Sequence, residues 1–182
     1  MLLTAVFFAS AQAQEQCAAC HGPDGNSLTP GIPSIAGQPL RFIENQLVLI
    51  REGLRPSPQM LPFVKDLKDA QIVALAKHFS GLPAKATQSA PENPALLKRG
   101  AALAQNLRCG VCHLSDYRGQ NQIPRLAAQR EDWLEPVMRE FRDRPRPGGD
   151  TIMAAALYGL PDADLRALAH FLSRRSAPAP ER

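Results

Sequence analysis

The chain has 182 residues, which is enough for one domain or for two small ones. Aromatic residues make up only 5% of it, and seventeen prolines interrupt a sequence rich in Ala, Leu and Gln, which favours short helices over sheet. The formal net charge is +4, but no basic run is interleaved with aromatic residues, so we expect no nucleic-acid partner.

The first thirteen residues, MLLTAVFFASAQA, carry no charge and end in Ala-Gln-Ala. This pattern is typical of the apolar region and cleavage site of an export signal, although the preceding positive residues are absent. The alternative is a retained first helix. Residues 1–13 are too few for a simple membrane anchor. If they are cleaved, the cysteines work in an oxidising compartment.

The remainder of the chain repeats itself with an offset of about 92 residues. IPSIAGQPLRFI, from Ile32, matches IPRLAAQREDWL, from Ile123, and LKDAQIVALAKHF matches LPDADLRALAHFL. Nearly constant offsets over several landmarks indicate a duplicated domain. We expect a first domain at 14–85, a Pro- and Ala-rich linker at 86–93, a second domain at 94–176 and a flexible tail at 177–182.

Each repeat is predicted to be all-α, with a helix, a cysteine motif, a Gly/Pro loop, a second helix, an Arg-Pro loop and a closing helix. Asp69 and Asp162 stand where an acidic residue stabilises the start of the closing helices. Apolar residues recur near helical spacing in the first closing helix, at Leu67, Ile72, Leu75 and Phe79.

All four cysteines lie in two motifs, CAACH at 17–21 and CGVCH at 109–113. A disulfide would not require a histidine after both pairs, and a thioredoxin-like pair would need a strand and helix context that the sequence lacks. A zinc site would have to collect its ligands from both repeats. Covalent attachment of c-type haem explains both motifs, because two thiols bond the porphyrin and the next histidine ligates the iron. We therefore expect two haems, attached through Cys17, Cys20, His21, Cys109, Cys112 and His113.

The sixth iron ligands are predicted from the methionines. Met60 follows the histidine of its motif by 39 residues and Met153 follows by 40, so both are expected to ligate iron. Met138 has no counterpart in the first repeat and is expected to be a packing residue. His78 and His170, on the closing helices, are out of register and are expected to be surface or boundary residues.

Two further pairs are candidates to contact the haems. Pro33 and Pro124 follow the motif histidines by 12 and 11 residues, where a carbonyl could accept the second ring proton of the histidine. The alternative is that they are only loop prolines. Arg55 and Arg146 begin Arg-Pro pairs shortly before the methionines and are candidates to bind haem propionates, or to lie in a solvated loop.

These motifs resemble the dihaem cytochromes c of the cytochrome c4 type, on CAACHGPDGNS, IPSIAGQ, the methionine loop and LKDAQIVALAKHFSGLP. The resemblance covers nearly the whole mature chain. It implies two tandem class I cytochrome c domains related by a pseudo-twofold axis, with haem propionate edges facing across the interface. By resemblance, His21 and Met60 would ligate one iron, and His113 and Met153 the other. Such domains open with a helix, but cleavage after Ala13 would leave only three residues before Cys17.

The resemblance implies a periplasmic electron carrier, often associated peripherally with the membrane. Its partners would be redox proteins, such as a bc1-type complex, a membrane oxidase or a dehydrogenase. A second hypothesis is an electron-accepting subunit of a periplasmic dehydrogenase. A third, a dihaem peroxidase, needs an open iron and a distal acid or base, and the matched methionines argue against it. We expect an electron-transfer protein rather than an enzyme.

Overall fold

The computed structural model describes residues 14–87, 91–144 and 150–176. The predicted signal at 1–13, the predicted tail at 177–182 and Arg146 lie outside the described residues. The described chain is helical, with one isolated bridge between Gln120 and Ile123 and no strand, so the all-α prediction is confirmed. Helices span 14–21, α2 (Leu40–Arg51), α3 (Leu61–Val64), α4 (Asp69–Ser80), α5 (Pro94–Asn106), α6 (Cys109–His113), α7 (Glu131–Asp143), α8 (Thr151–Leu157) and α9 (Asp162–Ser173).

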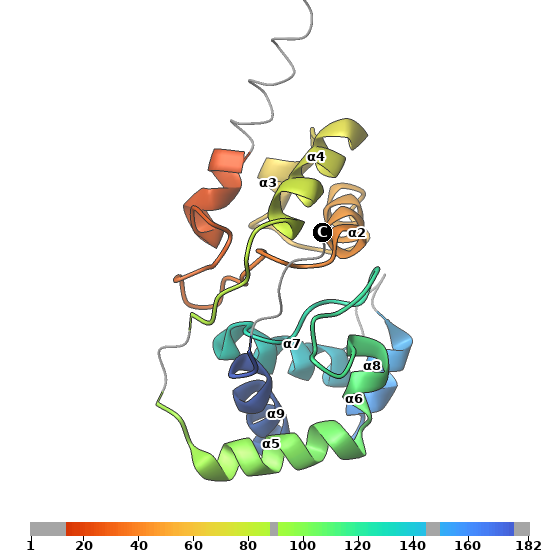
Figure 1. The fold of residues 1–182 in the computed structure, drawn as a ribbon. Helices are drawn as coiled ribbons and strands as arrows, with labels where there is room; N and C mark the ends of the chain where they lie inside the picture. The colour runs from red at the N-terminus through yellow and green to blue at the C-terminus, as the bar shows by residue number, and fades with distance from the viewer. Residues whose placement is uncertain (1–13, 88–90, 145–149, 177–182) are drawn as a thin grey trace, which may run out of the picture.

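The helices form two bodies, one for each repeat. The first helix and α2 to α4 make the upper body in Figure 1, and α5 to α9 make the lower one. Each body has its own hydrophobic core. The first core contains Ile43, Leu47, Ile50, Val64, Ile72, Leu75, Ala76 and Phe79. The second contains Ala104, Leu126, Leu134, Met138, Leu157, Leu165, Leu168, Ala169 and Leu172, which confirms Met138 as a packing residue.

The same ion pair closes the helix packing of both bodies. Arg51, the last residue of α2, donates to Asp69 Oδ1 at 2.8 Å, and Arg142 of α7 contacts Asp162 Oδ1 at 2.8 Å. Each arginine also donates to the carbonyl oxygen two residues before its aspartate, at 2.9 and 2.6 Å. Both aspartates occupy the first turn of the closing helix, as predicted, where a carboxylate is favourable. The duplicated contact therefore fastens the end of one helix to the start of the next.

In the second body, α5 crosses α9 at Gly100. A Cβ atom at this glycine would collide with the carbonyl oxygen of Ala167 and lie only 2.6 Å from Phe171 Cβ. The absence of a side chain at Gly100 lets the two backbones approach, so that α9 lies close against α5 (Figure 1).

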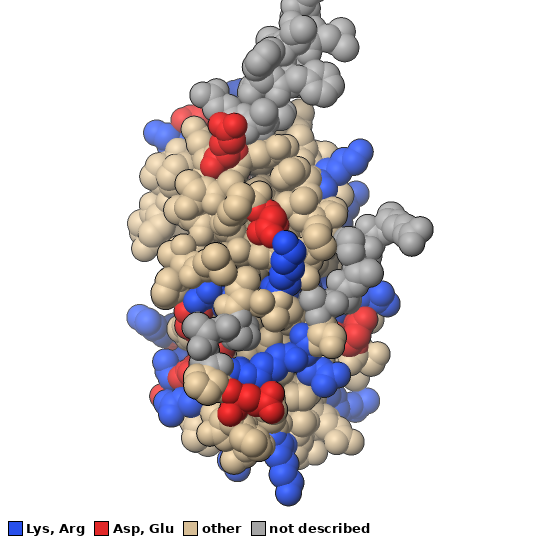
Figure 2. All heavy atoms as spheres, turned by 60° about the vertical axis from the view of Figure 1, so that its left-hand side comes forward, with Lys and Arg blue, Asp and Glu red and all other residues tan. Residues whose placement is uncertain are grey.

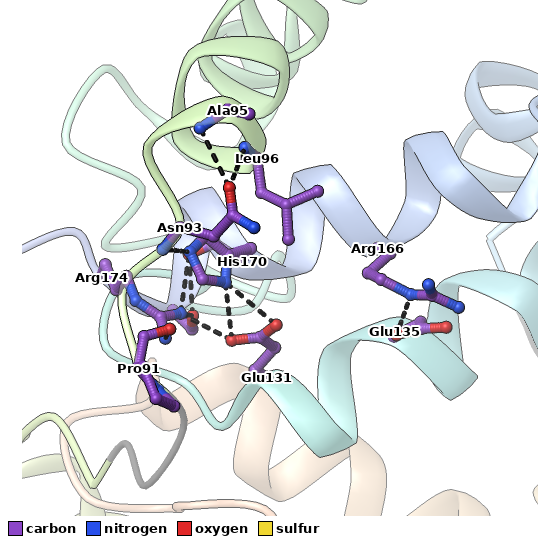
Figure 3. Close-up of polar contacts among 10 residues, drawn as sticks. Pro91, Asn93, Ala95, Leu96, Glu131, Glu135, Arg166, His170 and Arg174 are labelled. Atoms are coloured by element: carbon purple, nitrogen blue, oxygen red, sulfur yellow. Dashed lines mark hydrogen bonds and ion pairs between the residues drawn. The ribbon is translucent and has the colours of Figure 1, made fainter.

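His170 corrects one expectation, because it is buried (2% exposed) rather than at the surface or a boundary. Asn93 N–H donates to its Nε2 at 3.0 Å, which leaves Nδ1–H to donate to the Glu131 carboxylate at 3.1 Å (Figure 3). Arg174 donates to the same carboxylate at 2.6 Å and to the Pro91 carbonyl oxygen at 3.3 Å. The network attaches the segment before α5 to α7 and α9. His78 is half-buried.

The two bodies meet through a reciprocal set of buried hydrogen bonds. Ser34 N–H donates to Gln129 Oε1, and Gln129 Nε2 donates back to Ser34 O, both at 2.8 Å. Arg125 N–H donates to Gln38 Oε1 at 2.9 Å, and Gln38 Nε2 donates to Arg125 O at 3.1 Å. Ser34 and Arg125 are 91 positions apart, as are Gln38 and Gln129. Exchanging the repeats therefore reproduces the same contacts, which is what a pseudo-twofold axis requires.

Charged side chains are unevenly spread over the surface. On the face drawn in Figure 2, Lys, Arg, Asp and Glu side chains gather over the second body, whereas most of the first body is uncharged. None of the helices in the described ranges has the length and apolar composition that a membrane span requires.

Candidate haem sites

Each motif histidine lies at the end of a helix and is held by a proline carbonyl. His21 Nδ1–H donates to Pro33 O at 2.8 Å, and His113 Nδ1–H donates to Pro124 O at 2.9 Å. Both histidines are 7% exposed. Burial lowers the pKa of both, against the opposing effect of the carbonyl hydrogen bonds. Each ring is therefore neutral at pH 7, with Nδ1 protonated and the lone pair of Nε2 available to a metal.

The start of the loop between motif and proline has a similar backbone in both repeats, although the residues differ. Gly22 and Gly25 adopt positive φ angles of 88° and 72°, and Leu114 and Tyr117 do so at 67° and 58°. The carbonyl oxygen of Gly25 or Tyr117 accepts two backbone N–H groups from the segment after the proline, at 2.8 to 3.1 Å. These bonds place the proline carbonyl beside the histidine.

The two thiols of each motif differ in their exposure to solvent. None of them is in a disulfide. Cys17 and Cys109 are half-buried against the cores of their own repeats, whereas Cys20 and Cys112 are exposed. Burial raises the pKa of the Cys17 and Cys109 thiols. Within 14–87, 91–144 and 150–176, no three His, Cys, Asp or Glu side chains converge as a metal cluster, as a zinc site would need.

The two predicted methionine ligands lie against the same cores as these cysteines. Met60, just before α3, packs on the core that Cys17 borders. Met153, in the first turn of α8, packs on the core that Cys109 borders. The Asp150 side chain caps α8 by accepting from the N–H of Met153 at 3.3 Å and of the preceding residue at 2.7 Å. Each repeat therefore packs its first motif cysteine and its methionine on one core.

Apolar side chains are exposed beside these ligands. Leu61 and Phe63 follow Met60, Ile152 precedes Met153, and Val111 lies between the second pair of cysteines. Exposed apolar side chains are costly in water unless a ligand or partner covers them. The donor set and the apolar surroundings fit a covalently bound haem in each repeat.

Of the two arginines predicted to bind haem propionates, the structure describes only Arg55. Arg55 is half-buried and donates to Gln46 Oε1 at 2.5 Å, and Arg146 lies outside the described residues. Sequence reasoning missed Gln38, Gln129 and Arg125, which form the interface. A signal was present for the glutamines, because IPSIAGQ and IPRLAAQ both end in one.

Comparisons with known proteins agree with this geometry. Residues 9–79 match the family described as cytochrome c oxidase, cbb3-type, subunit III, and residues 97–176 match the cytochrome c family. Cytochrome c4 of Thiocapsa roseopersicina is 33% identical over 175 residues, which cover 89% of this chain and 88% of that protein. A thiosulfate dehydrogenase electron acceptor from Thiomonas intermedia is 28% identical, covering 86% and 77%.

A solved structure extends the agreement to three dimensions. Reduced recombinant cytochrome c4 from Pseudomonas stutzeri superposes with a TM-score of 0.81 at 27% identity, covering 92% of this chain and 98% of that one. The similarity spans both repeats and the whole of the relatives' paired arrangement, so each repeat is a class I cytochrome c domain with one covalent haem c. The chain therefore belongs to the cytochrome c4 family of dihaem electron-transfer cytochromes.

Proposed function

We propose that the protein is a periplasmic carrier that moves electrons from a respiratory donor, such as a bc1-type complex, to a terminal oxidase or other acceptor. Cys17, Cys20 and Cys109, Cys112 attach the two haems. His21 with Met60, and His113 with Met153, close the two irons. The observation that carries this proposal is the duplication, since in each repeat one cysteine and the methionine pack on the core and a proline carbonyl holds the motif histidine.

The residues of the chain set the conditions for one-electron transfer. A bound haem supplies an iron that alternates between the ferric and ferrous states. The carbonyls of Pro33 and Pro124 fix the orientation of the histidine rings, so little reorganisation accompanies a change of charge. A methionine opposite the histidine favours the ferrous state and raises the potential. If His21 and Met60 hold one iron and His113 and Met153 the other, neither iron would offer a site to a substrate.

A second candidate function is an electron-accepting subunit of a dehydrogenase. The similarity to a thiosulfate dehydrogenase electron acceptor favours it. The haem sites would be the same, but the partner would be permanent. Co-purification of a tagged chain from its native host separates the two functions, because a carrier elutes alone and a subunit elutes with its dehydrogenase in fixed ratio.

The haem assignment is tested with one set of variants. The denatured wild-type chain should exceed its polypeptide mass by two haems, and its oxidised form should show a sulfur-to-iron charge-transfer band in the far red. Met60→Ala and Met153→Ala should each remove about half of that band, because each opens one iron, which then binds carbon monoxide when reduced. Met138→Leu is the control and should keep the full band, since Met138 lies in the core. A mass of one haem with a disulfide would contradict the proposal.

We also propose that residues 1–13 are an export signal removed near Gln14 and that residues 86–93 link the domains. Lys85 still contacts the first domain, through Asp24 at 2.6 Å and Asn26 at 2.7 Å, whereas Pro91 and Asn93 contact the second. Sequencing the N-terminus of protein recovered from the periplasm tests the first boundary. Limited proteolysis, expected to cut within 86–90 and to leave two haem-bearing fragments, tests the second.

A further inference from the structure

Arg125 is a buried cation without a partner anion. Its side chain is only 1% exposed, and no acidic side chain pairs with it among the described residues. The guanidinium donates to two backbone carbonyl oxygens, and its Nε–H has no acceptor. Burial lowers the pKa of this guanidinium to about 10, which leaves it charged at pH 7. A buried charge that no protein carboxylate balances costs free energy of folding, so we ask what this charge does.

The two carbonyls place this charge at the interface between the two repeats. Nη1 donates to Ala127 O, and Nη2 donates to Ala36 O at 2.9 Å. Ala36 and Ala127 are 91 positions apart and are thus equivalent residues of the two repeats. Because it binds one of two equivalent carbonyls in each repeat, the guanidinium lies between the repeats. The residue equivalent to Arg125 is Ser34, as it must be, because two guanidinium groups could not share one site.

The interface is close to both haem sites. Ser34 and Arg125 directly follow Pro33 and Pro124, whose carbonyls accept from the two iron-binding histidines. The buried charge at the interface is therefore near the iron-binding histidines of both repeats. Interactions of buried charges are weakly screened, and a cation favours the redox state with less positive charge, which is ferrous.

We propose that Arg125 is a single buried cation shared by the two haems, which stabilises the reduced state of both. The inference rests on the proposed function, since it needs two haems. When a redox partner supplies one electron to either iron, the same charge assists the reduction.

The test compares the two midpoint potentials in a set of variants, after denatured mass has established two haems in each. In Arg125→Gln, both potentials should fall, by shifts that agree within about a factor of two, since the guanidinium binds equivalent carbonyls of both repeats. Arg125→Lys disturbs the same hydrogen bonds but keeps the charge, so both midpoint potentials should stay close to their wild-type values. The control is Arg130→Gln with Asp132→Asn, which removes a paired, neutral interface contact and should leave both potentials unchanged.

A fourth variant tests the symmetry directly. Ser34→Arg combined with Arg125→Ser moves the arginine to the other repeat, from which the same two carbonyls are reachable, and it should restore both potentials. A shift confined to one haem in Arg125→Gln, or no shift, would overturn the proposal, as would a lysine variant that behaves like glutamine. If instead the wild-type mass shows fewer than two haems, the proposed function itself is wrong.

Discussion

Gly100→Ala should destabilise the second domain, although alanine is the better helix residue. The added Cβ would collide with the Ala167 carbonyl oxygen and lie 2.6 and 2.8 Å from Phe171 Cβ and Ala167 C. Ordinary carbon contacts are about 3.5 to 4 Å, so α5 and α9 must separate. Two of these three neighbours are backbone atoms, which cannot rotate away.

The relative size of two opposing free-energy terms decides whether Gly100→Ala stabilises or destabilises the domain. Replacing Gly by Ala in a helix gains about 1 kcal/mol, whereas overpacking a rigid contact costs about 1–3 kcal/mol and occasionally more. Because the obstacle is backbone, we take an overpacking cost of about 3 kcal/mol, which leaves a net loss of about 2 kcal/mol in the free energy of unfolding. For a domain of this size, that lowers the melting temperature by roughly 8–16 °C.

Gly110→Ala provides a matched control in the same domain. Gly110 is also helical, but a Cβ there meets its nearest neighbour, Ser115 Cα, at an ordinary 3.5 Å, and the first repeat already has Ala18 at this place. This variant should keep or slightly raise the melting temperature. Fluorescence of Trp133 on α7, the single tryptophan, follows the second domain. A Gly100→Ala protein that melts at or above the wild-type temperature would refute the close-contact argument.

Two further predictions concern backbone strain and pH. Leu114→Gly should stabilise the second domain by about 1 kcal/mol, because φ 67° and ψ 163° lie in a region that essentially only glycine occupies; a lower melting temperature would show that the half-buried side chain outweighs the strain. Hydrogen bonds from the Arg130 side chain hold the pKa of Asp132 below its ordinary value. The ionised Asp132 carboxylate therefore stabilises the folded state fully above about pH 4, and this stabilisation is lost as the pH falls through the lower folded-state pKa. Asp132→Asn should flatten the fall of unfolding free energy below about pH 4, and an unchanged slope would show that other carboxylates cause it.

The local patterns of the sequence were sufficient for the longer helices and the haem motifs, but not for the short α3 and α8 beside the methionines. Helical spacing, acids at helix starts and the CAACH and CGVCH motifs act within a few residues, so one chain segment contains the whole signal. The repeat added the pairing of each histidine with a methionine about forty residues later. It also indicated that Met138, which lacks a counterpart, belongs to a core, as the structure confirms.

The tertiary structure alone decided the roles of His170, Gly100 and Arg125. The partners of His170 are Asn93 and Glu131, which are 77 and 39 positions away, so its burial leaves no local pattern. Arginine side chains are usually exposed. Only the placement of one repeat against the other buries Arg125 between Ala36 and Ala127. Side-chain periodicity reports which face of a helix is apolar, but not which distant backbone will pack against it. The interface between the domains, and the charge buried in it, exist only once both copies have folded and docked.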